Sequence, residues 1–289
     1  MKLNEFKKDF NSALSDLYPL EEIQSFFNIH SEKYLNLSRI EISLKPGAEI
    51  SKEIAEKFQN AWLRLKNYEP IQYIIGETEF YGLPFKVNKH TLIPRPETEE
   101  LVEWILCEFS NQQSTINNQQ FLDIGTGSGC IAISLAKNLP NSKASALDVS
   151  EKTLKIAKEN AELNNVKIDF FQADILETKT LPKQFDIIVS NPPYVRELEK
   201  KMMQQNVLKY EPDSALYVAD EDPLVFYRAI SQLAKTHLKP NGKLFFEINE
   251  YLGEEMKSLL KSEGFKNIEV KKDIFGKDRM LKCNLNEQA

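Results

Sequence analysis

Cysteine and histidine are scarce in this chain of 289 residues. The three cysteines, Cys107, Cys130 and Cys283, are odd in number and far apart in the sequence, which argues against a disulfide framework. The three histidines are equally scattered, so no spacing typical of metal ligands appears. We therefore expect a reduced protein of the cytoplasm that binds no metal.

Long apolar runs and an excess of positive charge are also missing. No stretch approaches the roughly 18 apolar residues that span a bilayer, and the polar residues 1–6 lack the core of a signal peptide. Acidic residues number 43 against 37 lysines and arginines, whereas a general nucleic-acid coat would need the opposite balance. We expect a monomer with no membrane association and no stable nucleic-acid partner.

The composition is otherwise that of a globular protein, and the chain falls into parts. A chain of this length holds one or two domains at about 150 residues each. Apolar side chains at three- and four-residue spacing predict a helical domain over residues 1–70, and they are Phe6, Phe10, Leu14, Leu17, Ile54, Phe58, Trp62 and Leu65. Residues 71–76, 78–82 and 83–87 have the pattern of short strands broken by glycine, so we interpret 71–93 as a β-hairpin linker.

From residue 120 onward, strand and helix patterns alternate. Strands are predicted at 121–124, 144–149, 168–171, 185–190 and 243–248, and helices begin near Pro96, Cys130, Ser150 and Pro223. Residues 268–270 and 280–285 suggest a final hairpin. The alternation predicts an α/β domain over residues 94–289, with a mostly parallel sheet and helices on both faces.

A glycine-rich loop, residues 123–129, lies between the first strand and its helix. Ligands of such sheets bind beyond the carboxyl ends of the strands, and glycines let the backbone turn sharply and approach a ligand. Asp148 ends the second strand, where an acid can bind both ribose hydroxyls, and Asp174 follows the third. Cys130 stands where a dinucleotide fingerprint has its third glycine, and no Walker lysine follows the loop. The loop resembles the S-adenosylmethionine loop of class I methyltransferases.

The tetrapeptide Asn191-Pro192-Pro193-Tyr194 follows the fourth strand. The Asn191 amide oxygen and the Pro192 carbonyl can accept the two hydrogens of a planar NH2 group, and the prolines fix the backbone. Tyr194 can stack on a flat amide or base and can lie near a cationic sulfonium. Two acceptors stabilise the positive charge that develops on nitrogen as it attacks a methyl group, so no strong base is needed beforehand.

The chain resembles the HemK/PrmC family over nearly its whole length. The family is that of the protein-(glutamine-N5) methyltransferases of peptide chain release factors. The matching stretches are residues 72–76, 79–82, 94–99, 123–129, 191–194, 210–212, 215–216 and 276–279. The family likewise has a helical N-terminal domain joined by a β-hairpin.

The resemblance implies a substrate and a set of contacts. The substrate is the glutamine of the Gly-Gly-Gln loop of release factors, methylated on its side-chain amide with S-adenosylmethionine as cofactor. Asn191, Pro192, Pro193 and Tyr194 would hold the glutamine, and Asn191, Pro192 and Tyr194 would serve catalysis. Residues 94–99 would close over the cofactor. The implied cofactor contacts are Gly125, Thr126, Gly127, Ser128, Gly129, Asp148, Asp174, Ile175 and Asn191.

Two departures from the family pattern stand out. Residues 218–222 replace a glycine-containing stretch, and Asn249 replaces the glycine that usually follows Glu247-Ile248. We expect neither to touch the tetrapeptide, so they bear on the local loop shape and not on the reaction.

Three other functions remain open from the residues. An adenine-N6 or guanine-N2 nucleic-acid methyltransferase would present the same NH2 geometry, although it must grip phosphates and often flips the base. A nicotinamide oxidoreductase would need tight NAD binding, which Cys130 argues against. A catalytically silent cofactor-binding module is the third, and the intact Asn191 and Tyr194 argue against it.

Overall fold

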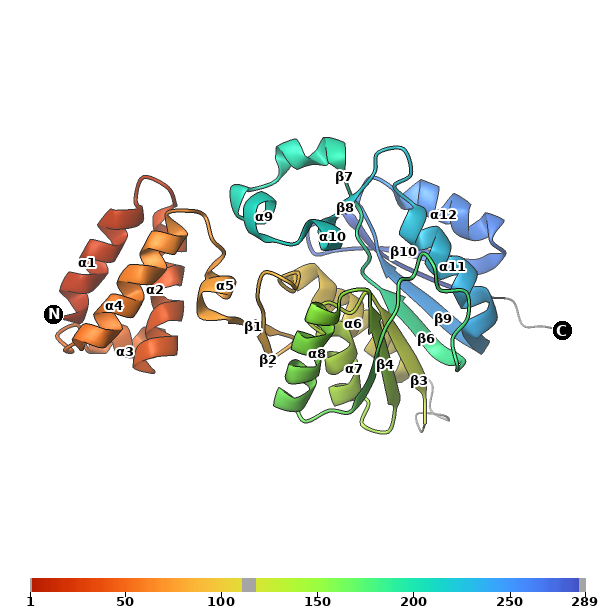
Figure 1. Cartoon of the computed structure of the whole chain (residues 1–289), viewed down its shortest axis with the longest axis horizontal. Coiled ribbons are helices and arrows are strands. Elements are labelled where there is room, and N and C mark those ends of the chain that lie inside the picture. The colour runs from red at the N-terminus through yellow and green to blue at the C-terminus, as the bar shows by residue number, and fades with distance from the viewer. Residues whose placement is uncertain (1, 111–117, 286–289) are drawn as a thin grey trace. The chain divides into compact units, whose positions relative to one another are not determined.

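The computed structural model describes residues 2–110 and 118–285. The chain divides into two compact units, and the first, the helical unit, comprises Met1–Gly76 with Gln204–Tyr210. The second, the sheet unit, comprises Glu77–Met203 with Glu211–Ala289 (Figure 1). The division falls after Gly76, whereas the sequence placed the first boundary at residue 70, and a short segment from the middle of the chain joins the helical unit.

Helices build the helical unit. They are α1 (Leu3–Leu14), α2 (Leu20–Leu35), α3 (Arg39–Leu44), α4 (Lys52–Leu65), α5 (Ile71–Ile75) and α9 (Gln205–Tyr210). The predicted apolar spacing places one stripe of each long helix in a shared core, where the rings of Phe6 and Phe58 meet edge to face at 5.2 Å. Leu17 lies beyond the end of α1 and is exposed, so the predicted stripe ends at Leu14.

The strand predicted at residues 71–76 is wrong, because residues 71–75 form the short helix α5. Pro70 precedes its first turn, and Ile71 and Ile74 point into the helical core at a spacing of three residues. Gly76, with φ of +76°, adopts the left-handed conformation that ends the helix. The run of β-branched residues suggested a strand, and burial against the helical core decides for a helix.

The predicted hairpin is confirmed over β1 (Glu77–Phe80) and β2 (Leu83–Lys86), which pair antiparallel. Tyr81 and Gly82 between them have φ of +51° and +70°, the two positive values that a type I′ turn requires. The hairpin belongs to the sheet unit, where the Lys86 N–H donates to Asn160 Oδ1 at 2.7 Å.

A seven-stranded sheet forms the centre of the sheet unit, in the order β10-β11-β9-β6-β3-β4-β5. Neighbours from β9 to β5 are parallel, and β11 and β10 are antiparallel to theirs, as predicted. The strands are β3 (Gln120–Ile124), β4 (Lys143–Asp148), β5 (Ile168–Gln172), β6 (Phe185–Ser190), β9 (Leu238–Glu247), β10 (Phe265–Lys272) and β11 (Asp278–Leu285). β9 begins five residues before the predicted Lys243, because an irregularity in its pairing with β6 absorbs residues 240–242.

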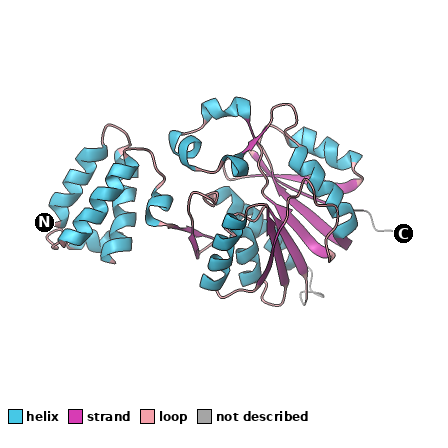
Figure 2. Ribbon diagram, in the orientation of Figure 1, coloured by secondary structure: helices cyan, strands magenta, loops and turns pink. Residues whose placement is uncertain are grey.

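Both faces of the sheet are buried at its central strands β3, β4 and β6, which explains why residues on both sides of these strands are apolar or small. Alternate residues point to opposite sides, so Phe121 packs with one core and Leu122 with the other. Helices α6 (Pro96–Ser110), α7 (Cys130–Asn138) and α8 (Glu151–Leu163) cover one face. Helices α11 (Val225–His237) and α12 (Gly253–Ser262) cover the other (Figure 2).

Strand β3 marks the switch point of the sheet, since the chain runs outward from it through β4 to β5 and then returns to β6 on its other side. Short elements follow β6, namely β7 (Val195–Arg196), the 3-10 helix η1 (Glu197–Met202), α10 (Asp213–Leu216) and β8 (Tyr217–Val218). Among the described residues, no helix combines the length and apolarity that crossing a membrane requires.

Candidate active site

A cavity of about 330 Å³ opens at the carboxyl ends of β3, β4 and β6. It has the position and the size expected for a ligand site in this kind of sheet. Ten residues that the sequence singled out line it, namely Gly125, Thr126, Gly127, Ser128, Asp148, Asp174, Ile175, Asn191, Pro192 and Pro193. The structure thus brings together the glycine-rich loop, both acids and most of the tetrapeptide, while Gly129 and Tyr194 lie outside the cavity lining.

The glycine-rich loop is held against the end of β4. The N–H groups of Gly125 and Thr126 both donate to the Leu147 carbonyl, each at 2.9 Å. Gly125 and Gly127 have φ of +71° and +57°, and a Cβ on either would meet no atom within 4 Å. The backbone therefore leaves open space beside these two glycines, which lets a ligand approach the main chain closely.

Asp148 lines the cavity beside the glycine-rich loop, and a backbone N–H of that loop holds its side chain. Its Oδ2 accepts the Gly127 N–H at 3.0 Å, and its Oδ1 accepts the Ser150 N–H at 2.9 Å. Burial raises the pKa of the Asp148 carboxyl, and these backbone donors partly offset the rise. Each carboxylate oxygen keeps a second acceptor site for a hydroxyl of a ligand.

Apolar side chains complete the cavity beyond the acids. Val149 and Leu176 line it and are 55% and 45% exposed, so both present apolar surface to a ligand. Ile175 lines the cavity between Asp174 and Leu176. An acid for ribose hydroxyls beside apolar surface for a purine ring, together with the open glycine backbone, fits a nucleoside such as that of S-adenosylmethionine.

Gly129 has a structural role in the geometry. It precedes α7 with φ of +84°, and a Cβ there would lie 2.9 Å from Ile133 Cδ1 and 3.4 Å from Ala157 Cβ. The left-handed φ favours glycine at the turn into α7, and the missing Cβ leaves the space that the side chains of Ile133 and Ala157 occupy.

Asp123, inside β3, is fully buried beneath the loop. Its Oδ2 accepts the Thr126 hydroxyl at 2.6 Å and the Ala132 N–H at 3.3 Å. Burial raises the pKa of the Asp123 carboxyl to about 7. The side chain ties the loop to its strand and does not line the cavity.

Asn191 lies at the end of β6 and faces the cavity next to the glycine-rich loop. Its Nδ2 donates to the Thr98 hydroxyl at 3.3 Å, and that hydroxyl donates to Glu247 Oε2 at 2.6 Å. Tyr194 donates its hydroxyl to the other oxygen of Glu247 at 2.9 Å. One buried carboxylate therefore contacts both ends of the tetrapeptide, directly or through Thr98.

The segment before α6 is anchored to a second buried acid. Glu211 accepts the Arg95 guanidinium at 2.6 Å and the Ile93 N–H at 3.2 Å, and its side chain is 1% exposed. Pro94, Arg95 and Thr98 line the cavity as a result. The two family-like stretches 94–99 and 210–212 are therefore in contact. Glu211, in the second stretch, holds the first stretch against the cavity.

The expectation that Asn249 does not touch the tetrapeptide is wrong. Its Nδ2 donates to the Tyr194 carbonyl at 3.0 Å and to Glu199 Oε2 at 2.9 Å. Asn249 is buried, and its amide cross-links the loop after β6 in a way that a glycine cannot. In the other departure, residues 218–222, Asp220 accepts the Leu198 N–H at 3.1 Å.

The cavity offers poor nucleophiles and bases. Burial raises the pKa of the Cys130 thiol to about 12, which keeps it protonated at neutral pH. The pKa of His90 is lowered by desolvation and by the nearby Lys152 and Lys89. Among the described residues, no group of histidines, cysteines and acids could hold a metal ion. The arrangement suits direct transfer between two bound molecules.

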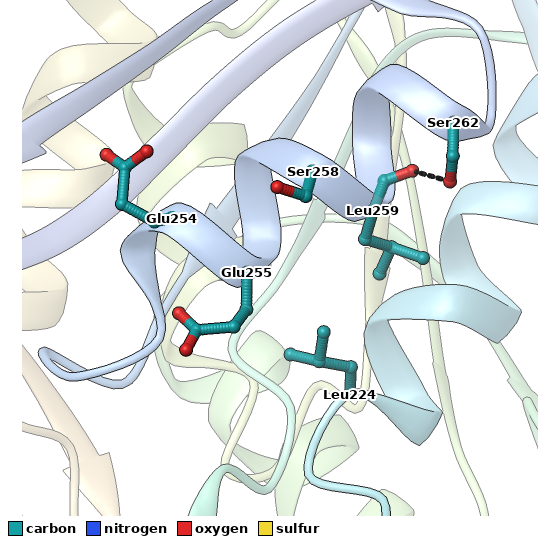
Figure 3. A pocket seen from close by; sticks show the side chains of 6 residues that line it. All are labelled: Leu224, Glu254, Glu255, Ser258, Leu259 and Ser262. Atoms are coloured by element: carbon teal, nitrogen blue, oxygen red, sulfur yellow. Dashed lines mark hydrogen bonds between the residues drawn. The ribbon is translucent and has the colours of Figure 1, made fainter.

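A second hollow of about 520 Å³ lies between Leu224 and one face of α12 (Figure 3). Its polar groups are Glu254, Glu255, Ser258 and Ser262, and the Ser262 hydroxyl donates to the Leu259 carbonyl at 2.7 Å. It contains none of the residues that follow β3, β4 or β6, so it lacks the features of a cofactor site.

Sequence reasoning included Thr98 only as part of the segment 94–99, missed Val149 and gave no role to Glu211 or Glu247. Glu211 and Glu247 lie in stretches that were noticed, but nothing local announces that each is buried and hydrogen-bonded across more than 100 residues of sequence. Only one sequence feature could have predicted a role for Glu247. Like Asp148, it is an acid at the carboxyl end of a strand.

Comparisons with known proteins agree with this geometry. The family model described as Methyltransferase small domain matches residues 104–216, and the one described as PrmC N-terminal domain matches residues 28–76. A release factor glutamine methyltransferase of Flavobacterium psychrophilum is 53% identical over 284 residues, which cover 98% of this chain and 99% of the relative. One of Bacteroides thetaiotaomicron is 43% identical over 283 residues, covering 98% and 100%.

Solved structures share the fold at low identity. The hMettl16 catalytic domain in complex with MAT2A 3′UTR hairpin 6 aligns with a TM-score of 0.56 at 16% identity, covering 83% of this chain and 84% of that one. The T. thermophilus rRNA methyltransferase RsmC in complex with AdoMet and guanosine aligns with a TM-score of 0.51 at 19% identity, covering 73% and 50%. The predicted α/β methyltransferase fold is confirmed.

Proposed function

This chain belongs to the release factor glutamine methyltransferase family, and from that premise we propose how its site performs the reaction. It transfers a methyl group from S-adenosylmethionine to the side-chain amide nitrogen of a release factor glutamine, which we assign to the Gly-Gly-Gln motif. The position of Asn191 carries the proposal, because its amide lines the same cavity as the glycine-rich loop.

Asn191 is oriented to accept a hydrogen bond from a substrate. Its Nδ2 donates to Thr98, and no described residue donates to its Oδ1. The Pro192 carbonyl is fixed by two consecutive prolines. We propose that these two oxygens accept the two hydrogens of the glutamine NH2 group and hold its nitrogen toward the cavity.

The same two acceptors favour the reaction itself. An amide nitrogen is a weak nucleophile, because its lone pair is delocalised into the carbonyl. As it becomes alkylated, its hydrogens become more acidic, and acceptors aimed at them stabilise the developing positive charge. Alignment of the nitrogen at about 3–3.5 Å from the methyl carbon supplies a further part of the rate. The cofactor would supply the methyl group from its sulfonium and would be left as a neutral thioether, and the methylated nitrogen then loses one of its two hydrogens as a proton to water.

We assign the cofactor contacts to the residues that line the cavity. The backbone of 125–128 lies beside the ligand, Asp148 accepts from the ribose hydroxyls, and Asp174 with Ile175 meets the purine. Support comes from the open space beside Gly125 and Gly127 and from the acceptor sites of Asp148. Gly129 acts through the packing of α7.

The remaining assignments concern partners. We propose that residues 1–70 form a substrate-recognition domain, and the PrmC N-terminal domain match, which begins at residue 28 and continues to residue 76, supports this. We propose that the enzyme works as a monomer in the cytoplasm, where release factors act. Its net charge of −6 supports the absence of a stable nucleic-acid partner.

Replacement of Asn191 tests the proposal. Asn191→Ala should keep the cofactor affinity of the wild type in calorimetry but lower kcat for release factor methylation by at least about 100-fold, the size of effect seen when one preorganised partner of a transition state is lost. Wild-type turnover in this variant would falsify the role of Asn191 as amide acceptor.

A further inference from the structure

We propose that Glu247 and Thr98 are positioning residues that fix the orientation of the Asn191 side-chain amide, so that its oxygen and not its NH2 group faces the substrate. The inference deepens the proposed function and rests on it. A planar carboxamide can present either end to the same point, and only one end can accept a hydrogen of the substrate amide. Some feature of the protein must therefore select between the two orientations.

The selecting contacts form one chain of hydrogen bonds. It runs from Asn191 Nδ2 to Thr98 Oγ1 at 3.3 Å, and from Thr98 Oγ1 to Glu247 Oε2 at 2.6 Å. Thr98 and Glu247 are 2% and 1% exposed, so water does not compete for these groups. The residues come from three separate elements, the end of β6, the first turn of α6 and the end of β9.

The direction of each bond follows from donor and acceptor inventories. Each oxygen of Glu247 faces a hydroxyl, Thr98 on one side and Tyr194 on the other, and in its ionised form the carboxylate accepts from both. A hydroxyl has one hydrogen, and once Thr98 donates it to Glu247, its oxygen can only accept from Asn191. The NH2 group of Asn191 is thereby directed at Thr98, and Oδ1 is left for the substrate.

Glu247 also holds the far end of the tetrapeptide. Its Oε1 accepts the Tyr194 hydroxyl at 2.9 Å, which uses the second oxygen as an acceptor too. Burial raises the pKa of the Glu247 carboxyl, and the hydrogen bonds from Thr98 and Tyr194 together with the nearby Arg279 partly offset the rise. Arg279 is itself held by Asp273 at 3.1 Å. The carboxylate thus supports both Asn191 and Tyr194 from behind the cavity.

Replacement of Thr98 separates positioning from packing. Thr98→Val keeps the shape of the side chain and removes the hydroxyl, so the amide loses its selected orientation. We expect kcat for release factor methylation to fall by about 10- to 100-fold, in line with the cost of small misplacements in a site, while cofactor affinity changes much less. Thr98→Ser retains the hydroxyl and should restore most of the turnover. Ser231→Ala removes an equally buried hydroxyl from α11 at a position outside the cavity lining and should leave kcat unchanged.

A double-mutant cycle gives the sharper readout. If Thr98 acts through Asn191, then Thr98→Val should have no further effect on kcat in the Asn191→Ala background. Independent, multiplicative losses in the two variants would overturn the inference, because they would show that Thr98 contributes by another route.

A second variant keeps the inference testable if Thr98→Val does not fold. Glu247→Gln keeps the volume but offers an NH2 group to Thr98 or Tyr194, so it should lower kcat more than it weakens cofactor binding. Thermal unfolding and cofactor titration verify that each variant is folded. If the wild type methylates the factor and both Thr98→Val and Glu247→Gln match its kcat, the inference is wrong. If the wild type itself is inactive on the factor, the proposed function fails instead.

Discussion

Two buried carboxyl groups at the ends of neighbouring strands differ in what they can do. Asp148 keeps acceptor sites beside the cavity, whereas Asp123 lies beneath the loop and binds Thr126 and Ala132. The sequence distinguished them by position alone, since one is within the loop motif and the other ends the next strand. The role of Glu247 could not be predicted in this way, because its partners Thr98 and Tyr194 are 149 and 53 residues away.

Asp148→Ala should weaken cofactor binding by at least about tenfold, because hydrogen bonds to a charged group contribute about 1.5–3 kcal/mol each. Isothermal titration calorimetry with S-adenosylmethionine measures the dissociation constant. Asp169→Ala provides the matched control, since it removes the same charge from an exposed position on β5 outside the cavity. Equal affinity in the Asp148 variant and the control would remove Asp148 from the cofactor site.

Asp123 should make the free energy of unfolding depend on pH. Its folded pKa of about 7 lies above the ordinary value of 3.8, so the folded state keeps a proton that the unfolded state has released between these values. Its contribution to stability is therefore fully present below about pH 4 and is lost as pH rises toward about 7. The free energy of unfolding of the wild type, relative to Asp123→Asn, should fall over this range. Urea unfolding at several pH values, without cofactor, measures the difference, and a difference that rises with pH would contradict the account.

At the scale of elements, the local sequence patterns predicted most strands of the sheet. They failed at residues 71–75, where tertiary packing outweighs the intrinsic preference of the residues for a strand. The strands β3, β4 and β6 are short, mostly buried segments bounded by loops, and their type and approximate bounds could be predicted because both faces of the sheet are covered there. Residues 71–75 have the same β-branched character, yet they pack into a helical core and become α5. A five-residue apolar run does not contain the information that separates these two outcomes.

Gly129→Ala tests the entry into α7. The left-handed conformation of residue 129 should make alanine cost about 1–2 kcal/mol in the free energy of unfolding, because the Ile133 side chain can rotate away from the new Cβ but the backbone cannot change. Chemical denaturation measures the change. Gly47→Ala is the control, because its Cβ would meet nothing within 4 Å, and no positive φ is involved. A loss no larger than that of the control would show that the turn does not need glycine.

At the scale of the whole molecule, the cavity belongs to one of the two units. Every residue that lines the cavity lies between His90 and Ile230 within the sheet unit. The helical unit has its own core, and it includes the segment Gln204–Tyr210, where Tyr210 donates to the Asn67 carbonyl at 2.9 Å. Sequence periodicity predicted a helical domain at the N-terminus, but it could not assign this later segment, which is short and has no buried stripe of its own.

Phe58→Ala tests whether the helical unit can lose stability without a loss of cofactor affinity in the sheet unit. Phe58 is fully buried in the helical core against Phe6 and Phe27, so its truncation should lower the free energy of unfolding of that unit by about 3–5 kcal/mol. Cofactor affinity should stay that of the wild type, and KM for the release factor should rise if the helical unit recognises the substrate. Calorimetry, cofactor titration and initial rates give the three quantities. A loss of cofactor affinity would show that the site depends on the helical core.

The central claim is that the acceptor is the glutamine amide of a release factor. The most direct measurement is methyl transfer from labelled S-adenosylmethionine to purified release factor, beside a copy in which the glutamine of the Gly-Gly-Gln motif is alanine. Total RNA and DNA serve as parallel acceptors. The account predicts label on the wild-type factor alone. Label on nucleic acid with a blank release factor would contradict it, and would move the same NH2 chemistry to an exocyclic amine of a base.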